Sequence, residues 1–335
     1  MNLTSASSVS SVVESCREWW SVVVDVIHFP DDARPAHWVQ PVLALGNFDG
    51  VHRGHRKILE RVRRCAGEHG ATSVVMTFDP HPSRVVRPDN APPLLMTTAQ
   101  KLDALAVAGL HGAAIVRFTQ ALSHWDPEMF VRTVLVDWLR VAEVWVGANF
   151  LFGHDRSGNF SMLRTLGGRY GFKAEKIDAV RYKDFVVSST RIRRLISEGR
   201  VDEAAALLGH EYYVGGTVVK GNRRGTKIGF PTANLCTDNE LLPPNGVYAT
   251  TTRVAEIVYP SITNIGVRPT VDESGRMTVE SHIFNFDRDL YGASIQIGFV
   301  QRLRDERAFD SLDLLKAQIA ADCARARGLF DHLSL

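Results

Sequence analysis

Between Gln40 and Val180, apolar strand-like runs alternate with amphipathic helical ones, and this alternation constrains the fold more than any other feature of the chain. The strand-like runs are "PVLALG", "TSVVMTF", "GAAIVRF", "AEVWVG" and "FKAEKIDAV"; apolar residues recur at helical spacing over 53–69, 98–108, 127–139 and 160–170. Strands that alternate with helices of this length form βαβ units. We therefore predict a parallel sheet with helices, which binds ligands at the carboxyl ends of its strands.

The pattern changes after His210. Just before it, "SSTRIRRLISEGR" and "VDEAAALLG" predict two helices, the first capped by Ser189 or Thr190. Beyond it, short β-rich runs separated by Gly, Pro, Asn and Asp predict a small antiparallel barrel, followed by an amphipathic helix over 311–327. We expect an N-terminal extension over 1–20, a first domain over 21–205 and a second domain over 206–335.

Composition excludes several classes of protein. The 335 residues are 45% hydrophobic and 23% charged, which is typical of a globular protein with an ample core. A net charge of +2 argues against bulk binding to nucleic acid or anionic membrane, and no apolar run approaches the roughly 18 residues of a membrane helix. The four cysteines form no C-x-x-C motif, so we expect free thiols and a cytoplasmic location.

The first candidate site is "GNFDGVHRGH", at a predicted strand-to-helix turn. His52 and His55 are three residues apart, so both imidazoles lie on one face of the first helical turn. Gly46 and Gly50 permit a tight turn, and Gly54 permits close approach to the backbone. A helix N-terminus favours phosphate, so the imidazoles can stabilise charge that develops on a phosphate under attack.

Two other interpretations of the histidines remain. A structural zinc site needs two more ligands, and Cys65 lies about three helical turns away. Packing histidines are common, but a pair beside a glycine-rich turn favours the phosphate interpretation. A second segment, "VSSTRIRR", places hydroxyls and Arg193 at a helix start; it can hold a triphosphate, or be an ordinary cap followed by surface arginines.

The third candidate is "GNRRGTKIGFPTAN". It does not satisfy the P-loop pattern, because Ile228 stands where Ser or Thr is required. Its glycines can still supply backbone N–H groups to phosphate, and Thr232 and Asn234 offer the oxygen donors that Mg²⁺ accepts. The alternative is a solvated basic loop. Glu280, in the strand-like "MTVESHIF", can be a general base, although the pattern alone favours a solvent-facing position.

Together these motifs resemble the prokaryotic bifunctional riboflavin kinase/FMN adenylyltransferase family, also called FAD synthetase. The resemblance runs over about residues 22–327 and rests on "LGNFDGVHRGH", "TFDPHP", "VSSTRIR", "GFPTAN", "PNGVYA", "NIGVRPT", "VESHIF" and "DLYG", in the family's order. It implies an N-terminal Rossmann-like nucleotidyltransferase domain and a C-terminal riboflavin kinase barrel with a final helix.

For the first domain, the resemblance implies joining of FMN and ATP to give FAD and pyrophosphate. His52 and His55 match the H-x-G-H pair that acts on the α-phosphate. The implied ATP-binding residues are Gly46, Asn47, Phe48, Gly54, Ser188, Ser189, Thr190 and Arg193. The implied flavin-binding residues are Phe78, Asp79 and Asn149, with His81 in the same "FDPHP" turn.

For the second domain, the resemblance implies phosphorylation of riboflavin by ATP. Glu280 matches the general base, and Thr232 and Asn234 match the element that binds Mg²⁺ and ATP phosphates. The other implied ATP-binding residues are Gly221, Gly225, Lys227 and Gly229, and Arg304 falls at a flavin-side position. The loop "GNRRGTK" is more basic than the resemblance leads us to expect.

The expected partners are therefore small molecules: riboflavin, FMN, FAD and ATP, with Mg²⁺ as cofactor. We expect neither nucleic acid nor membrane as a partner, and allow for a transient homo-oligomer. One alternative is a nucleotidyltransferase active only in its first domain, with a non-catalytic or RNA-binding barrel. Another is a nucleic-acid-binding protein, since H-x-G-H is similar to a motif of class I aminoacyl-tRNA synthetases and small barrels often bind RNA.

Overall fold

The computed structural model describes residues 25–221, 225, 228–267 and 277–333. The chain divides into two compact units. The first comprises the residues up to Pro92 and from Thr98 to Arg181, and the second comprises Pro93–Thr97 and the residues from Tyr182 onward. The extension expected over 1–20 lies outside the described residues. The expected domain boundary at 205/206 stays a prediction.

The first unit is built on a six-stranded sheet in which every paired strand is parallel. Its strands are β1 (Asp25–Phe29), β2 (Val42–Leu45), β3 (Ser73–Asp79), β4 (Gly112–Arg117), β5 (Glu143–Gly147) and β8 (Lys173–Ile177), in the spatial order β1-β4-β3-β2-β5-β8. The predicted parallel sheet is thus confirmed. The alternating pattern did not indicate the edge strand β1, which pairs with β4.

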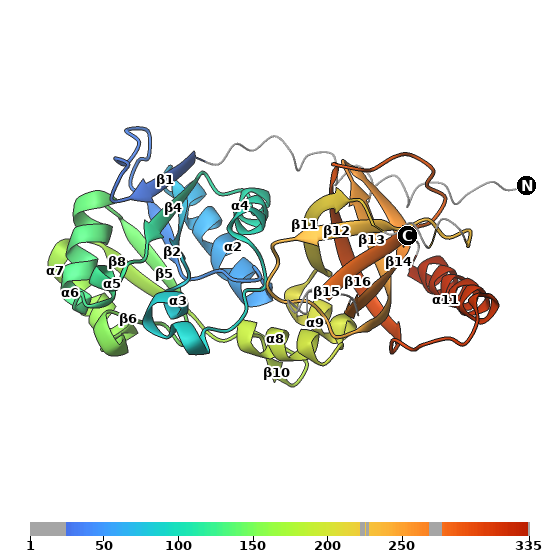
Figure 1. Cartoon of the computed structure of the whole chain (residues 1–335). Helices are drawn as coiled ribbons and strands as arrows, with labels where there is room; N and C mark the ends of the chain where they lie inside the picture. The colour runs from blue at the N-terminus through green and yellow to red at the C-terminus, as the bar shows by residue number, and fades with distance from the viewer. Residues whose placement is uncertain (1–24, 222–224, 226–227, 268–276, 334–335) are drawn as a thin grey trace, which may run out of the picture. The chain divides into compact units, whose positions relative to one another are not determined.

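Helices cover both faces of this sheet (Figure 1). The helical segments are α2 (Arg53–Glu68), α3 (Pro82–Val86), η1 (Pro88–Asn90), α4 (Thr98–Val107), α5 (Gln120–Ser123), α6 (Pro127–Phe130), η2 (Val131–Trp138), η3 (His154–Arg156) and α7 (Phe160–Tyr170). The helix expected over 127–139 is α6 continued by η2, which has π-helical hydrogen bonding. A short hairpin, β6 (Leu151–Phe152) with β7 (Gly158–Asn159), precedes α7.

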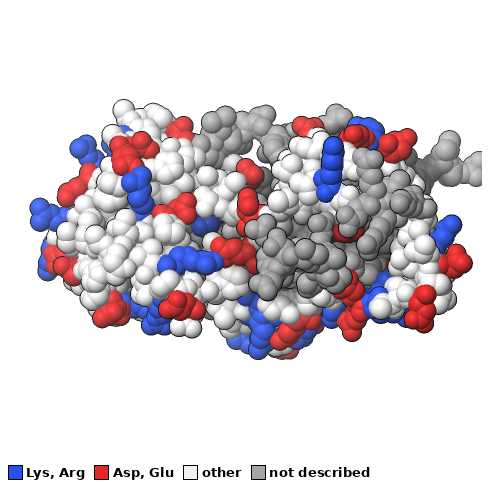
Figure 2. Space-filling model, viewed as in Figure 1, with Lys and Arg blue, Asp and Glu red and all other residues white. Residues whose placement is uncertain are grey.

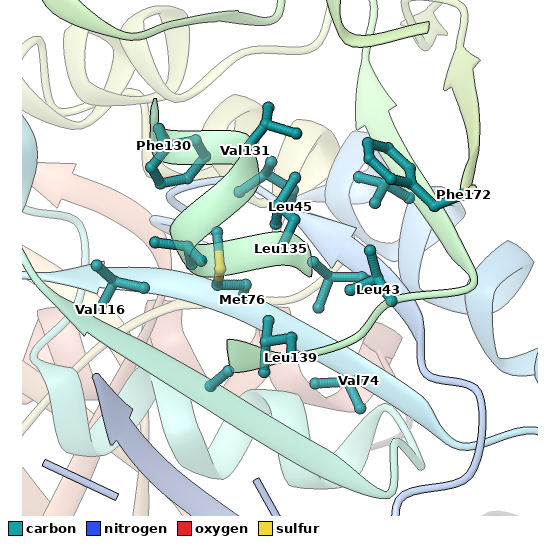
Figure 3. Packing of buried hydrophobic residues seen from close by; sticks show 14 of the residues in the cluster. Leu43, Leu45, Val74, Met76, Val116, Phe130, Val131, Leu135, Leu139 and Phe172 are labelled. Carbon is teal, nitrogen blue, oxygen red and sulfur yellow. The ribbon is translucent and has the colours of Figure 1, made fainter. Parts of the chain in front are cut away.

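Two layers of apolar side chains explain why the sheet strands read as nearly continuous apolar runs. On one face, alternate strand residues pack against η2 and α7 (Figure 3). The residues labelled there are Leu43, Leu45, Val74, Met76, Val116, Phe130, Val131, Leu135, Leu139 and Phe172. The other face receives the apolar stripe of α2, formed by Ile58, Leu59, Val62, Cys65 and Ala66. Burial on both faces fixes the register of each strand, because a one-residue slip would invert its side chains.

The strand order places a switch point beside β2. From β2 the chain proceeds to β3 and β4 on one side, whereas β5 pairs with the other side of β2. In open parallel sheets, ligands bind where the strand order reverses, outside the carboxyl ends of the strands. The "GNFDG" turn follows β2, and Asn149 follows β5, so both predicted segments lie at this edge.

The second unit contains a closed antiparallel barrel in the order β11-β12-β15-β14-β13-β16, which confirms the predicted barrel. Its strands are β11 (Tyr212–Val219), β12 (Ala233–Thr237), β13 (Gly246–Val254), β14 (Ile257–Val267), β15 (Met277–Ile283) and β16 (Ser294–Arg304). The C-terminal helix α11 (Leu312–Leu333) packs its buried residues Cys323, Ala326 and Phe330 on the barrel.

Helices α8 (Ser189–Ser197) and α9 (Val201–Leu208) also belong to the second unit, after a hairpin of β9 (Arg181–Tyr182) and β10 (Phe185–Val186). The expected N-cap of α8 at Ser189 or Thr190 is wrong. Ser188 is the N-cap, because its extended backbone lets its side-chain oxygen accept a hydrogen bond from the Arg191 N–H. Gly209, with φ of 83°, terminates α9.

Candidate active sites

The turn that follows β2 has an unusual backbone conformation. Phe48, Gly50 and Val51 have φ of 49°, 86° and 35°, in the left-handed region that non-glycine residues seldom adopt. The turn is held to the neighbouring strand because the Thr77 hydroxyl donates a 3.0 Å hydrogen bond to the carbonyl of Asn47. Such clustered backbone strain persists only where surrounding contacts impose it, and it is concentrated at functional sites.

Glycines beside this turn make room for rings of the protein itself. A Cβ on Gly46 would lie 3.3 Å from the ring of Phe48, and one on Gly54 would lie 3.1 Å from Cε1 of His52. The sequence indicated that Gly54 permits close approach to the backbone, and the group that approaches is the His52 imidazole. Both glycines thus shape the site through packing.

The two histidines of the H-x-G-H motif lie face to face. His52 is the N-cap of α2, and its Nδ1 accepts a 3.2 Å hydrogen bond from the backbone N–H of His55. The ring centroids are 3.6 Å apart, with an interplanar angle of 11°. The pair therefore stands at the positive end of a 16-residue helix, where an anion is favoured.

His55 is neutral at physiological pH. Burial holds the pKa of its imidazole well below the usual value, and the nearby charges of His52 and Lys101 lower it further. Within the described part of the chain its Nδ1 is buried and has no hydrogen-bond partner. A neutral imidazole with an unsatisfied buried nitrogen is poised to bind a polar ligand atom.

Of the residues predicted to bind flavin, Phe78 and Asp79 end strand β3 and Asn149 follows β5. Phe78 is half-buried and makes an edge-to-face contact with Phe118 at 5.6 Å between ring centroids. Asp79 and Asn149 are exposed at the ends of their strands. Phe130 lies 6.3 Å from Phe78, so an aromatic cluster surrounds this position. No sequence motif indicates this cluster, because its rings come from elements that are separated along the chain.

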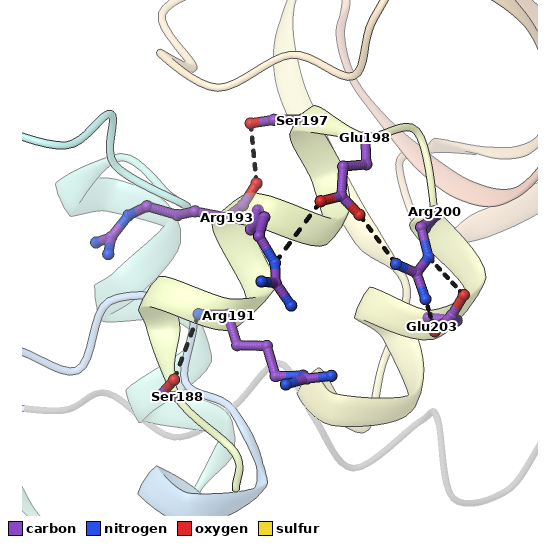
Figure 4. Close-up of polar contacts among 8 residues, drawn as sticks. Ser188, Arg191, Arg193, Ser197, Glu198, Arg200 and Glu203 are labelled. Carbon is purple, nitrogen blue, oxygen red and sulfur yellow. Dashed lines mark hydrogen bonds and ion pairs between the residues drawn. The ribbon is translucent and has the colours of Figure 1, made fainter. Parts of the chain in front are cut away.

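The "SSTRIR" segment lies in the second unit, where the Ser188 side-chain oxygen accepts a 3.3 Å hydrogen bond from the Arg191 N–H (Figure 4). Arg193 donates from Nε to the carbonyl of Pro93 at 2.8 Å, and the Arg191 guanidinium lies 3.8 Å from the centroid of the Phe185 ring. Ser189 and Thr190 begin α8 after the Ser188 cap. Their expected use together with the two histidines stays a prediction.

In the barrel, strand register places three polar residues side by side. Glu280 on β15 lies directly opposite Asn234 on β12 and opposite Asn264 on β14. Directly opposed residues of antiparallel strands project from the same face with about 5 Å between their Cβ atoms. All three are half-buried. The solvent-facing position that the pattern favoured for Glu280 agrees with the burial along β15, where Glu280 is partly exposed between the buried Val279 and Ser281. Asn264 was not among the predicted site residues, because only strand pairing brings it beside Glu280.

Two described glycines of the predicted phosphate loop, Gly221 and Gly225, lie beside Asn234 and Thr232. A Cβ on Gly221 would lie 2.4 Å from the Asn234 side chain, and one on Gly225 would lie 3.4 Å from the hydroxyl of Thr232. The carbonyl of Gly225 accepts hydrogen bonds from Ile228 and Phe230, and Gly229 has φ of 89°. The structure thus brings Gly221, Gly225, Thr232 and Asn234 together. Lys227 lies outside the described residues.

Thr232 and Asn234 are the residues predicted to hold Mg²⁺. Among the described residues, no group of three or more His, Cys, Asp or Glu side chains can hold a metal. Mg²⁺ needs few protein ligands, because it keeps water and takes phosphate oxygens from its nucleotide. The oxygens of Thr232 and Asn234 are of the type that such a metal–nucleotide complex uses, and the Asn234 side chain packs directly against the backbone of Gly221. Mg²⁺ at these residues stays a prediction.

Arg304 is bound by the C-terminal helix. Its Nε lies 2.9 Å and its Nη2 2.8 Å from Oδ2 of Asp322, a side chain that is 6% exposed. Asp322 also accepts a 2.7 Å hydrogen bond from Gln318. A bidentate pair of this kind fixes the plane of the guanidinium. Only the orientation of α11 reveals the pairing, because 18 residues separate the partners.

On the face drawn in Figure 2, the described residues form no large field of one charge sign. In Figure 2, Lys and Arg alternate with Asp and Glu over the described residues of the visible face. Several of these charges are paired, as in Arg200 with Glu198 and Glu203. No helix in the described ranges is long and apolar enough to cross a membrane.

Comparison with known proteins identifies the family of both units. Family models match twice: FAD synthetase over residues 34–191 and riboflavin kinase over residues 208–330. The bifunctional riboflavin kinase/FMN adenylyltransferase of Pseudomonas fluorescens is 38% identical over 86% of this chain and 92% of its own length. The bifunctional riboflavin kinase/FMN adenylyltransferase of Bacillus subtilis is 35% identical over 87% of this chain and 93% of its own length.

A solved structure has the same fold over most of this chain. It is described as a macrolide-efflux protein from Streptococcus pneumoniae, is 28% identical, and covers 91% of this chain and 99% of its own, with a TM-score of 0.82. Because the curated relatives match this chain across both units, and because each unit also matches its own family model, the chain belongs to the bifunctional riboflavin kinase/FMN adenylyltransferase family.

Proposed function

We propose that this chain makes both flavin cofactors: it phosphorylates riboflavin with ATP to give FMN, and it adenylylates FMN with a second ATP to give FAD and pyrophosphate. One observation carries the proposal. The chain holds two separate phosphate-handling arrangements, the stacked histidines at the start of α2 and the Gly221–Asn234–Glu280 group of the barrel. Its membership of the family supports the pairing of the two activities.

In adenylyl transfer, a phosphate oxygen of FMN attacks the α-phosphorus of ATP. The bond from that phosphorus to the oxygen bridging to the β-phosphate breaks, and pyrophosphate leaves with the electron pair. His52 and His55 hydrogen-bond the α-phosphate oxygens, whose charge increases in the transition state. Since His55 is neutral, it acts through a hydrogen bond rather than through a full charge. Catalysis is by positioning and electrostatics, with no covalent enzyme intermediate.

In phosphoryl transfer, the oxygen of the ribityl 5′-hydroxyl attacks the γ-phosphorus of ATP, and Glu280 accepts the proton of that hydroxyl. ADP leaves when the bond to the β–γ bridging oxygen breaks. Thr232 and Asn234 hold Mg²⁺, which neutralises charge on the transferring phosphate when it is bound. The opposed register of Asn234 and Glu280 supports this arrangement, because it brings the phosphate-side and hydroxyl-side groups to one face.

The remaining assignments follow from the same proposal. In the first site ATP binds Gly46, Asn47, Phe48 and Gly54 with Ser188, Ser189, Thr190 and Arg193, and the isoalloxazine ring binds beside Phe78, Asp79 and Asn149. In the second site ATP also contacts Gly221, Gly225, Lys227 and Gly229, and Arg304 orients riboflavin. The boundary between the two domains lies near residue 205 in the chain. The enzyme works in the cytoplasm on small molecules, without nucleic acid or membrane, and as a transient homo-oligomer at most.

The proposal is tested with two variants of the full chain, supplied with riboflavin, ATP and Mg²⁺ and followed by chromatography. His52→Asn keeps a side-chain acceptor at the N-cap of α2 but removes the imidazole. It is expected to accumulate FMN without FAD. Glu280→Gln is expected to leave riboflavin unconverted but still turn added FMN into FAD. The activity that each variant retains therefore serves as the control for its folding.

The outcomes separate the hypotheses. Wild-type protein that forms neither product refutes the proposal. FAD from added FMN, but no FMN from riboflavin, identifies a nucleotidyltransferase with an inactive barrel. Loss of both activities from either variant, in protein that remains folded by circular dichroism, contradicts two independent sites.

A further inference from the structure

Lys101 is a buried cation that the roles assigned so far do not use. It lies on α4 and is only 6% exposed, which is rare for lysine. Its Nζ donates a 3.3 Å hydrogen bond to the hydroxyl of Thr77. Burial lowers the pKa of its ammonium group, and the carboxylates of Asp49 and Asp79 oppose that effect. The desolvation of a lysine is costly, so its position calls for an explanation.

The contacts of Lys101 lead directly to the strained turn. The Thr77 hydroxyl accepts from Lys101 and donates to the carbonyl of Asn47, which stands immediately before Phe48. A second bond, from the Gly46 N–H to the Met76 carbonyl, joins the same two segments. Lys101 therefore braces the end of β3 against the turn that leads into His52.

We infer that Lys101 is a positioning residue for adenylyl transfer: through Thr77 it fixes the turn from Asn47 to Val51, and it places a buried positive charge near His55. The inference rests on the proposed adenylyltransferase activity. It deepens that proposal by assigning a role to a residue that makes no contact with the reacting atoms.

The charge of Lys101 has a direct consequence for His55. The groups that act on the His55 imidazole are His52 and Lys101, and both lower its pKa in addition to the effect of burial. Asp49 and Asp79 act on Lys101. Removal of the ammonium charge leaves these carboxylates unbalanced and takes a cation away from His55. Both changes favour imidazolium, so the pKa of His55 rises.

The test uses Lys101→Met, which approximates the length of the side chain without its charge, in the full-length enzyme. We expect kcat for FAD formation from FMN and ATP to fall by roughly tenfold or more. In the plot of kcat against pH, the acid limb should move to higher pH. Riboflavin phosphorylation by the same preparation should stay unchanged. Histidine-ring NMR, with the His55 signal assigned by His55→Gln, should show His55 gaining a proton at higher pH than in wild type. Lys176→Met, at an exposed lysine of β8, is the matched control and should alter none of these readouts.

Thr77→Val separates the two parts of the role. It removes the hydroxyl bridge but keeps the charge, so kcat for FAD formation should fall while the acid limb stays in place. Lys101→Arg keeps the charge and should likewise retain the wild-type acid limb. These two variants carry the test should Lys101→Met not fold.

The inference would be overturned if folded Lys101→Met kept the wild-type kcat and the wild-type acid limb of the pH profile for FAD formation. It would also be overturned if Thr77→Val kept the wild-type kcat. A Lys101→Arg acid limb displaced to higher pH would also overturn it. If instead the wild-type enzyme makes no FAD, the proposed function itself has failed, which is a different result.

Discussion

Gly221→Ala is expected to disable the kinase reaction selectively. The added Cβ would lie 2.4 Å from Nδ2 of Asn234 and 2.6 Å from both its Cγ and its Oδ1, whereas ordinary contact begins near 3.4 Å. The Asn234 side chain must therefore move by about 1 Å, the difference between 3.4 Å and 2.4 Å. A displacement of this size in a group that positions substrate costs about 10²-fold in rate. We expect kcat for riboflavin phosphorylation to fall by about that factor.

The assay measures FMN formed from riboflavin over a range of Mg²⁺ concentrations, with FAD formed from added FMN as an internal control. Gly328→Ala is the matched substitution, because its Cβ meets no atom within 4 Å in helix α11. It should leave both rates unchanged and stabilise the helix by up to about 1 kcal/mol. A Gly221→Ala enzyme with wild-type phosphorylation would show that the position of Asn234 does not matter. Equal loss of both activities would indicate a folding defect instead.

Two further predictions concern stability and thiol chemistry. Asp322→Ala leaves the largely buried Arg304 guanidinium without its carboxylate, so urea denaturation should show a loss of about 3 kcal/mol; a loss under 1 kcal/mol would contradict a structural pairing. Burial raises the pKa of Cys323 to about 11, so below pH 9 its reactive thiolate form is scarce. Peptide mapping after brief alkylation at pH 8 should find exposed Cys236 labelled well before Cys323 and the buried Cys65, and equal labelling would refute that order.

In the first unit, the sequence was sufficient where local periodicity controls the structure. The stretches 53–69 and 160–170 predicted α2 and α7 to within a residue, because an apolar stripe must repeat every three to four residues to bury one helix face. His52 and His55 lie together as predicted, but through capping: His52 precedes the helix with an extended backbone and its ring accepts a hydrogen bond from the His55 N–H. The edge strand β1 was missed, because it is short and its burial alternates along five residues.

In the barrel, the sequence identified the chemistry of Glu280 but not its surroundings. The pattern alone favoured solvent exposure, and only the resemblance to a family pointed to a catalytic role. Its position between Asn234 and Asn264 depends on two strand pairings that join segments 46 and 16 residues apart in the chain. Nothing within one strand specifies which residue of another will stand opposite, because register is set by burial of whole faces.

The sequence by itself determined the elements that repeat locally, the division into an α/β part and a β part, and the motifs that indicate two phosphate sites. Only the tertiary structure decided which groups lose contact with water and which lie together. Lys101 illustrates the difference. In the sequence it is one more polar residue of an amphipathic helix, whereas in the fold it is buried against Thr77 and near His55. Desolvation and pairing depend on everything packed around a side chain, so no local pattern could assign them.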